Sequence, residues 1–287
     1  MFEPTQILII LGFEINSINM TVKLTAEKVT RLVDVCQMLV QSTTTSIRTV
    51  AQVTGYMEAS FQGIMFGPLY YRTTEKEKSL ALKLPNGKYE AEMSLTKHAK
   101  QELRWWVMNT PTAYNVINRC SPDMIVFTDA SNIGWGGVIK GQARAGGNWT
   151  PTEANNHINY LQLLAILYSL QAFTENVKDA HVKVMCDNTT AVSCINHMGT
   201  SHLDLCNTLT KSIWEWCAKY NIWLTAAHIP GVDNESADYE SRVAHTGTEW
   251  QLHKQLLQCA LSTLNYYPDV DLFASRHNTQ CKLYVSY

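Results

Sequence analysis

The sequence lacks the features that mark several common classes of protein. Its eight cysteines include no Cys-x-x-Cys pair, and several lie in apolar or amphipathic runs, so we expect reduced, buried thiols without zinc or disulfides. The apolar run at residues 7–13 follows Glu3 and has no basic region or small-residue cleavage site. Neither this run nor any later one is long enough to cross a bilayer. We therefore expect an intracellular protein, cytoplasmic or nuclear, with no membrane partner.

A strong charge of one sign is also missing. The 23 Lys and Arg residues are nearly balanced by 25 Asp and Glu residues, which leaves a formal net charge of -2. Such a chain creates no strong long-range field for nucleic acid, so any contact with a polyanion must come from a local basic patch. With 287 residues, 46% of them hydrophobic, the chain can bury a sizeable core and is expected to hold two domains.

The N-terminal part has the pattern of a β-hairpin followed by helices. Residues 11–16 and 20–24 alternate apolar and polar side chains on either side of a turn, which predicts the hairpin. Residues 1–115 are therefore predicted to form a small hairpin-plus-helices module. Four helices are predicted in it, two that begin at the candidate N-caps Thr25 and Ser46 and two that cover residues 69–82 and 94–108.

From Met124 onward, strand-like and helix-like runs follow one another, separated by turn glycines. This order predicts an α/β domain at 122–245, with a mixed five-stranded sheet flanked by helices. Residues 246–287 are predicted to add an amphipathic helix and a loop at 269–273. The predicted strands of the α/β domain are residues 124–128, 135–139, 143–149, 181–186 and 222–228. Its predicted helices are residues 158–174, 189–197 and 203–220, with a short helix that opens at Ser236.

Four positions in this half carry the side chains of a candidate metal site. Asp129 and Asp187 each end an apolar run, Gln162 lies on a helix predicted to be amphipathic, and Asp238 lies near the start of a short helix. Carboxylates that meet from separate elements suit divalent cations, and two such cations roughly 4 Å apart can activate a water and neutralise a phosphate. The pattern therefore favours phosphodiester chemistry, with the three aspartates as metal ligands and an amide at the fourth position.

Each of these residues also has an ordinary structural explanation. Asp129 could bond the turn after its strand, Asp187 could cap the following helix, and Asp238 could be a solvated residue in the first turn of a helix. Gln162 by itself is a helix former, and His228 could be a satisfied core histidine. Considered one at a time, these residues leave both the metal-site role and the structural role open.

Taken together, the motifs resemble those of ribonuclease H. The resemblance rests on the spacing of the four positions and on three local sequences. These are Phe-Thr-Asp129-Ala-Ser with Gly-Trp-Gly-Gly after it, Cys-Asp187-Asn, and Ala-His228-Ile-Pro-Gly-Val-Asp-Asn-Glu-Ser-Ala-Asp238.

Within that family, the chain is similar to the RNase H domain of a retrotransposon polyprotein. Phe127-Thr-Asp-Ala-Ser, Asn159-Tyr-Leu-Gln-Leu-Leu and Asp271-Leu-Phe-Ala-Ser resemble the DIRS-like, tyrosine-recombinase group. The segment from Leu11 to the helix through Gly55 resembles the thumb and connection of a reverse transcriptase. The resemblance thus covers most of the chain.

The resemblance implies a role for each residue. The three aspartates would be ligands of Mg²⁺, with Mn²⁺ as an alternative, and His228 would assist proton transfer or product release. The implied substrate is an RNA/DNA hybrid, read through 2′-hydroxyls and phosphates with low sequence specificity. The implied partner is the remainder of a retroelement polymerase. Contact with the substrate is implied for Ser131, Asn132, Asn188 and Asn234.

Two departures from the family pattern bear on activity. The chain contains no Tyr-x-Asp-Asp polymerase motif, so we expect no polymerisation by this chain alone. Gln162 stands where the family has a metal-bridging glutamate, and a neutral amide binds Mg²⁺ poorly. We therefore expect an RNase H-type endonuclease that is weakened by Gln162. Two alternatives stay open, namely a catalytically dead fragment that binds nucleic acid and a scaffold fragment of a reverse transcriptase.

Overall fold

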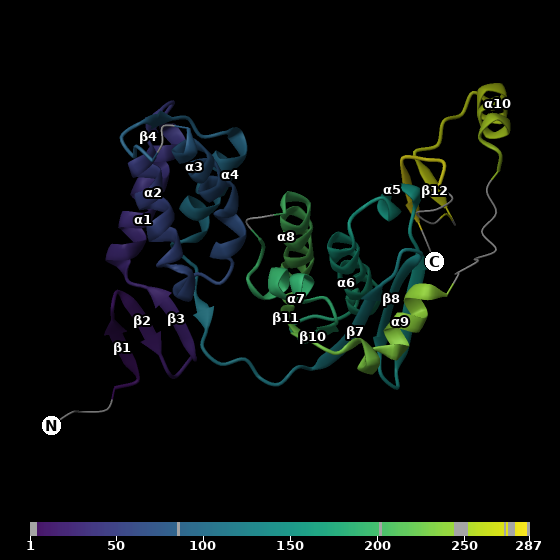
Figure 1. Ribbon diagram of the computed structural model, residues 1–287, viewed down its shortest axis with the longest axis horizontal. Helices are drawn as coiled ribbons and strands as arrows, with labels where there is room; N and C mark the ends of the chain where they lie inside the picture. The colour runs from purple at the N-terminus through teal and green to yellow at the C-terminus, as the bar shows by residue number, and fades with distance from the viewer. Residues whose placement is uncertain are drawn as a thin grey trace.

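The computed structural model describes residues 5–84, 87–200, 203–243, 252–272, 274 and 279–285. Figure 1 shows an N-terminal group of strands and helices, joined by an extended segment to a larger sheet with its own helices. The strands of the N-terminal group are β1 (Ile7–Ile10), β2 (Phe13–Asn16), β3 (Thr21–Leu24), β4 (Thr45–Ser46), β5 (Glu92–Met93) and β6 (Asn115–Val116). Its helices are α1 (Ala26–Gln41), α2 (Ile47–Glu58), α3 (Arg72–Lys83) and α4 (Lys97–Asn109), with short 3-10 helices η1 (Phe61–Gly63) and η2 (Gly67–Tyr70).

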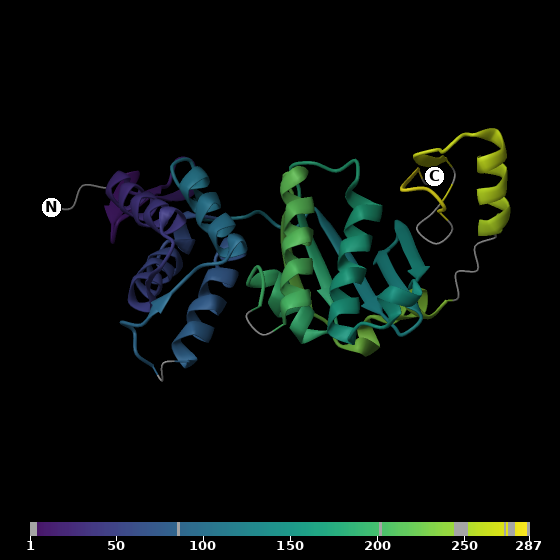
Figure 2. The ribbon, with the colours of Figure 1, turned by 90° about the horizontal axis from the view of Figure 1, so that it is seen from above.

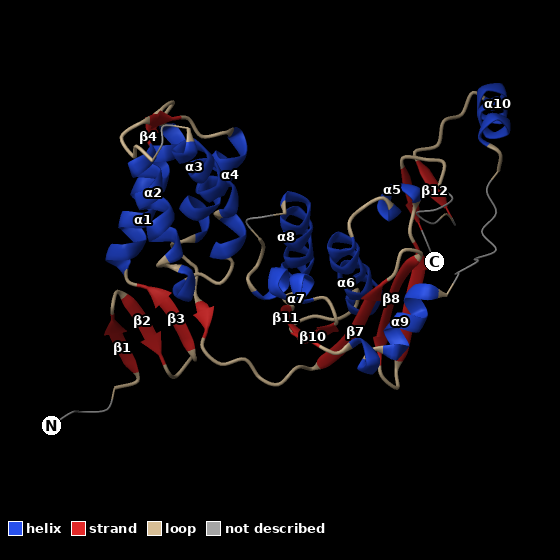
Figure 3. Cartoon of the chain, in the orientation of Figure 1, coloured by secondary structure: helices blue, strands red, loops and turns tan. Residues whose placement is uncertain are grey.

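The predicted hairpin is present as β2 and β3, and it is part of a larger sheet. The sheet has the order β1-β2-β3-β6, so β1 is a strand that the sequence analysis did not predict. Ser46 caps α2 as predicted, since its hydroxyl accepts from the backbone N–H of Thr49 at 3.2 Å. Thr25 occupies the N-cap of α1 but makes no side-chain capping bond. Figure 3 shows the four helices α1 to α4 gathered beside this sheet.

The third predicted helix begins later than expected. The prediction started it at Leu69, whereas α3 starts at Arg72 and η2 precedes it. Pro68 lies at the start of η2, and Gly67 lies so close to the Trp106 ring that an added Cβ would be 2.8 Å from it. Close packing against the ring therefore determines the local path, which a helical pattern in the sequence could not reveal.

The second half folds as a mixed five-stranded sheet with the order β11-β10-β7-β8-β9. β7 pairs parallel with β10 and antiparallel with β8, and β10 pairs parallel with β11. The predicted fold class is confirmed, and every predicted strand and helix is present with ends shifted by at most a few residues. The strands are β7 (Met124–Ala130), β8 (Gly134–Ile139), β9 (Ala143–Asn148), β10 (His181–Cys186) and β11 (Trp223–His228). The helices are α5 (Pro151–Ala154), α6 (Ile158–Thr174), α7 (Thr189–Asn196), α8 (Asp204–Lys219) and α9 (Glu235–Arg242), with η3 (Gly231–Asp233) before α9.

Two neighbouring glycines of β8 show that helices cover both faces of this sheet. A Cβ added at Gly136 would meet the Ala237 carbonyl of α9 at 2.4 Å, and one added at Gly137 would meet the Ser169 hydroxyl of α6 at 2.3 Å. Successive residues of a strand point to opposite faces, so α6 and α9 lie on opposite faces of the sheet. Figure 2 shows α6 and α8 side by side on the face away from α9.

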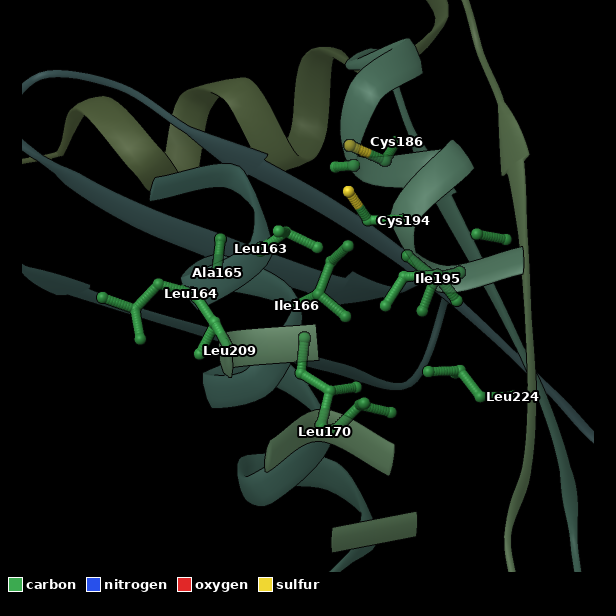
Figure 4. Packing of buried hydrophobic residues seen from close by; sticks show 14 of the residues in the cluster. Leu163, Leu164, Ala165, Ile166, Leu170, Cys186, Cys194, Ile195, Leu209 and Leu224 are labelled. Carbon is green, nitrogen blue, oxygen red and sulfur yellow. The ribbon is translucent and has the colours of Figure 1, made fainter. Parts of the chain in front are cut away.

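The core of the α/β domain surrounds α6. The six residues from Leu161 to Ile166 are all buried, because the sheet lies on one side of the helix and α7 and α8 lie on another. Figure 4 shows several leucines and isoleucines of this core, among them Leu163 and Ile166 of α6, together with Cys186 and Cys194. The prediction of an amphipathic α6 is therefore wrong, since the helix is apolar around most of its circumference. Gln162 on this helix is buried, with 4% of its surface exposed.

The cysteines divide into buried and exposed groups. Cys36, Cys186, Cys194, Cys206 and Cys217 are buried, as expected, whereas Cys120 and Cys259 are exposed. Burial raises the pKa of Cys36, Cys186 and Cys217 to about 12. These three thiols are therefore protonated near neutral pH.

Polar contacts join the N-terminal group to the α/β domain. Arg72 donates to the His197 carbonyl oxygen at 3.0 Å, and Lys76 pairs with Asp204 at 2.5 Å. In addition, the Arg119 guanidinium lies 3.3 Å from the centre of the Trp223 ring. The predicted division at residues 115 and 122 remains a prediction.

The C-terminal elements are α10 (Lys254–Leu264), β12 (Val270–Leu272) and β13 (Leu283–Val285). The helix agrees with the prediction for this segment. The predicted loop at 269–273 is instead largely the strand β12, which pairs parallel with β13. Residue 273 lies outside the described part of the chain. None of the helices in the described parts of the chain has the length and apolarity needed to cross a membrane.

Candidate active site

Parallel pairing of β7 with β10 brings Asp129 and Asp187 to the same edge of the sheet. The register places Cys186 beside Thr128, and Asp187 and Asp129 are the residues that directly follow them in the sequence. β7 and β10 are thus neighbouring parallel strands of the sheet. Asp129 is buried with 4% of its surface exposed, while Asp187 is partly buried.

Gln162 reaches this edge from α6 and bonds directly to Asp129. Its amide nitrogen donates to Asp129 Oδ1 at 3.1 Å and to the Ala130 carbonyl oxygen at 3.3 Å. Its amide oxygen accepts from the Cys186 thiol at 3.3 Å. This orientation of the amide is the chemically consistent one, because Asp129 and Ala130 offer only acceptors on one side and the protonated thiol offers a donor on the other.

The second oxygen of Asp129 is also bonded. Ser241 of α9 donates to Asp129 Oδ2 at 2.7 Å, and Ser241 is itself fully buried. Ser241 was not among the site residues predicted from the sequence. The sequence did show that Ser241 lies three residues after Asp238 on the same short helix. It gave no indication that the Ser241 hydroxyl bonds a carboxylate 112 residues away.

Asp238 lies in the first turn of α9 and has a cation as its partner. Arg242, one turn further along the helix, donates to Asp238 Oδ1 through Nε at 2.8 Å and through a terminal nitrogen at 2.6 Å. Both side chains are substantially exposed, at 65% and 44%, so solvent screens the ion pair and its net stabilisation is small.

Asp187 is the carboxyl group with a shifted pKa in this cluster. Burial raises the pKa of Asp187, repulsion from Asp129 and Asp238 raises it further, and the His228 side chain opposes the rise. Repulsion within the carboxylate cluster thus adds to the effect of burial. The alternative that Asp187 caps the next helix is wrong, because the N-cap of α7 is Asn188.

The raised pKa of Asp187 predicts how stability depends on pH. An acid whose pKa is higher in the folded protein stabilises the fold fully below its ordinary value of 3.8, and this contribution is lost as pH rises through the folded pKa. Asp187→Asn removes the repelled charge, so we expect a higher free energy of unfolding near pH 7 in metal-free buffer and little gain near pH 3. Urea denaturation at the two pH values measures this. Asp34→Asn, on the exposed face of α1, is the control, and an equal gain for Asp187→Asn at both pH values contradicts the electrostatic explanation.

The four residues predicted to contact substrate differ in their surroundings. Asn132 is exposed in the turn after β7. Asn188 accepts from the Ala191 N–H as the cap of α7 and donates to Asn159 Oδ1 at 2.9 Å. Ser131 is buried and donates to the Ser241 carbonyl oxygen, and Asn234, 2% exposed, donates to the Thr128 carbonyl oxygen. Ser131 and Asn234 therefore hold the backbone around the site, and substrate contact by all four stays a prediction.

The donor set suits a hard divalent cation at the Asp129–Asp187 pair. Both are carboxylates at the ends of adjacent parallel strands. A bound divalent cation would offset the repulsion between their two negative charges. Among the described residues, however, no three His, Cys, Asp or Glu side chains form a candidate metal cluster. The fourth position is an amide that already donates to Asp129, and Asp238 is paired with Arg242. The predicted roles of the three aspartates as metal ligands stay predictions.

The strand order, the helices on both sheet faces and the aspartates at one sheet edge define a domain of the RNase H-like class. Residues 120–218 match the family model of the RNase H-like domain found in reverse transcriptase. The chain is also 30% identical over 135 residues to the enzymatic polyproteins of cauliflower mosaic virus strains D/H and Strasbourg, a match that covers 42% of this chain and 19% of each polyprotein. The chain thus spans about a fifth of the length of these curated relatives. Over the matched part, the chain is thus similar to the RNase H-like domain of reverse transcriptases and to retroelement polyproteins.

Solved structures with similar folds include cellular and viral proteins. RNase H1 from the archaeon Halobacterium salinarum has a TM-score of 0.35 and 18% identity, covering 41% of this chain and 92% of its own. LC11-RNase H1 in complex with an RNA/DNA hybrid has a TM-score of 0.36 and 19% identity, covering 41% and 93%. The foamy viral protease-reverse transcriptase in complex with an RNA/DNA hybrid has a TM-score of 0.33 and 15% identity, covering 86% and 32%. The narrower likenesses to the DIRS-like group and to a thumb and connection stay predictions.

Proposed function

We propose that the α/β domain is an RNase H-type endonuclease that cuts the RNA strand of RNA/DNA hybrids by two-metal hydrolysis, and that Gln162 weakens it. The observation that carries the proposal is the meeting of Asp129, Gln162 and Asp187 at one edge of an RNase H-like sheet. The family match over residues 120–218 supports it. The remainder of a retroelement polymerase is the proposed partner.

Each residue has a distinct task in the proposed reaction. Asp129, Asp187 and Asp238 would hold Mg²⁺ or Mn²⁺, which when bound supplies an activated water and neutralises charge on the phosphate. His228 lies exposed at the end of β11 and acts on Asp187 electrostatically, which supports a role in which its imidazole would give or take a proton near the scissile phosphate. Asn132, exposed after β7, would contact the hybrid backbone.

One observation favours hybrid binding without turnover as a second function. The Gln162 amide donates a hydrogen bond to Asp129, where a glutamate would place a second negative charge. The amide thus satisfies one oxygen of Asp129 without adding a second negative charge to attract a cation. A domain of this kind keeps a surface for the hybrid but binds the catalytic metals weakly.

The test is a binding and cleavage assay on the unaltered protein. We expect hybrid affinity to fall by about tenfold or more between low and moderate salt, because phosphate contacts release counterions. We expect slow cleavage in Mg²⁺ and none in EDTA. A DNA duplex of the same sequence is the control for RNA-strand recognition, and it should be bound but not cut.

The outcomes separate the candidate functions. Slow, metal-dependent cleavage supports the endonuclease, and hybrid binding with no cleavage supports the binding function. No hybrid binding even at low salt contradicts both and leaves the scaffold role.

A further inference from the structure

Ser241 makes a short bond from the last helix of the domain to Asp129. The hydroxyl lies 2.7 Å from Asp129 Oδ2 and 2.9 Å from the Asp238 carbonyl oxygen. A hydroxyl has only one hydrogen to donate, and a bond to an ionised carboxylate is about twice as strong as one to a neutral carbonyl. The hydrogen therefore points to Asp129.

A second serine fixes the same turn of α9 in place. The Ser131 hydroxyl donates to the Ser241 carbonyl oxygen at 2.6 Å. The same hydroxyl oxygen accepts from the backbone N–H groups of Ile133 and Gly134, at 3.1 and 3.2 Å. Carbonyls in the last turn of a helix have no partner within the helix, and here the turn after β7 supplies one.

Close backbone approach completes the attachment. A Cβ at Gly136 of β8 would lie 2.7 Å from the Ser241 backbone nitrogen, so only a glycine allows α9 to lie this close to the sheet. The buried end of α9 is thus held by the sheet surface and by two serine bonds. Its position determines where Asp238 stands relative to Asp129.

We propose that Ser241 is a positioning residue that holds the Asp129 carboxylate in the orientation needed for metal binding. The proposal rests on the proposed endonuclease function. Gln162 holds one oxygen of Asp129 and Ser241 holds the other, so the plane of the carboxylate is set from two different helices. Ser241 itself touches neither substrate nor metal in this assignment.

The experiment uses as parent the Gln162→Glu protein, which loses the Gln162 donor but keeps the Ser241 bond to Asp129 Oδ2. It measures Mn²⁺ affinity by electron paramagnetic resonance, beside kcat and KM for hybrid cleavage. Loss of a group that orients a metal ligand costs about 10- to 100-fold in metal affinity or activity. We expect Ser241→Ala to weaken Mn²⁺ binding and lower kcat in this range while KM for hybrid stays within about twofold. Ser241→Cys, which keeps a weak donor, should recover part of the loss.

Two control variants separate orientation from folding. Ser131→Ala removes the second serine bond and leaves the Asp129 bond, so it should lower thermal stability with a smaller effect on Mn²⁺ affinity. Ser212→Ala, whose hydroxyl bonds the Thr208 carbonyl on α8, should change neither. Thermal unfolding of each variant reports whether it is folded at the assay temperature.

Failure of this proposal differs from failure of the proposed function. If the parent cleaves hybrid and a folded Ser241→Ala variant keeps its Mn²⁺ affinity and kcat, Ser241 is only structural. Equal losses in Ser131→Ala and Ser241→Ala assign the effect to helix attachment and also overturn the proposal. A parent that neither cleaves nor binds Mn²⁺ overturns the endonuclease function, and the role of Ser241 with it.

Discussion

Gln162→Glu is expected to raise the rate of hybrid cleavage by about a thousandfold, which corresponds to about 4 kcal/mol of activation free energy. The two side chains have the same length, so the packing around α6 is kept. The change replaces the donor that now faces Asp129 Oδ1 and the Ala130 carbonyl with a second carboxylate. The Cys186 thiol still has an acceptor to bond. The altered site has a buried pair of negative charges that only a cation can satisfy. The rate is measured as single-turnover cleavage of a hybrid in Mg²⁺, beside the unaltered protein.

Two measurements check the origin of this gain. Asp129→Asn in the Gln162→Glu background should abolish the gain, whereas Asp34→Asn on α1 should leave it intact. Gln162→Glu should also lower the melting temperature in EDTA and recover it in Mg²⁺, because a metal that binds only the folded state stabilises it. An unchanged cleavage rate with intact hybrid binding locates the inactivation outside position 162. The binding function would then be the better account.

Gly136→Ala is expected to lower the free energy of unfolding by about 1–3 kcal/mol, the usual cost of overpacking. The added methyl would meet the Ala237 carbonyl oxygen at 2.4 Å and the Ser241 nitrogen at 2.7 Å. Both are backbone atoms, so α9 as a whole must move away from the sheet. Because α9 carries Asp238 and Ser241, the same change should remove cleavage by the Gln162→Glu protein. Urea denaturation measures the stability.

Gly55→Ala is the matched control for that experiment. Gly55 lies inside α2, where an added Cβ has nothing within 4 Å. A glycine in a helix interior is less favourable than alanine by about 1 kcal/mol, so Gly55→Ala should be neutral or stabilising. If Gly136→Ala is equally harmless, the close approach of α9 to β8 is not a requirement of the fold.

The sequence was informative where a pattern repeats along a continuous segment. The five strands and the helices α6 to α9 of the α/β domain were predictable because alternation and helical spacing reflect which face of each element is buried. The late start of α3 and the strands β1 and β12 were missed, because packing against Trp106 and pairing with other strands decide them. The amphipathic prediction for α6 failed since this helix is covered by the sheet and by other helices.

The candidate site also has some features that the sequence predicted and others that only the structure shows. The sequence by itself determined which residues stand at the ends of β7 and β10, because strand length and apolar runs are local properties. It also determined that position 162 is an amide. Only the tertiary structure decided that this amide donates to Asp129 and that Ser241 of α9 reaches the same carboxylate. Hydrogen bonds between residues more than thirty positions apart, such as Gln162 with Asp129, depend on how the elements pack. The spacing of these residues along the chain does not predict how the elements pack.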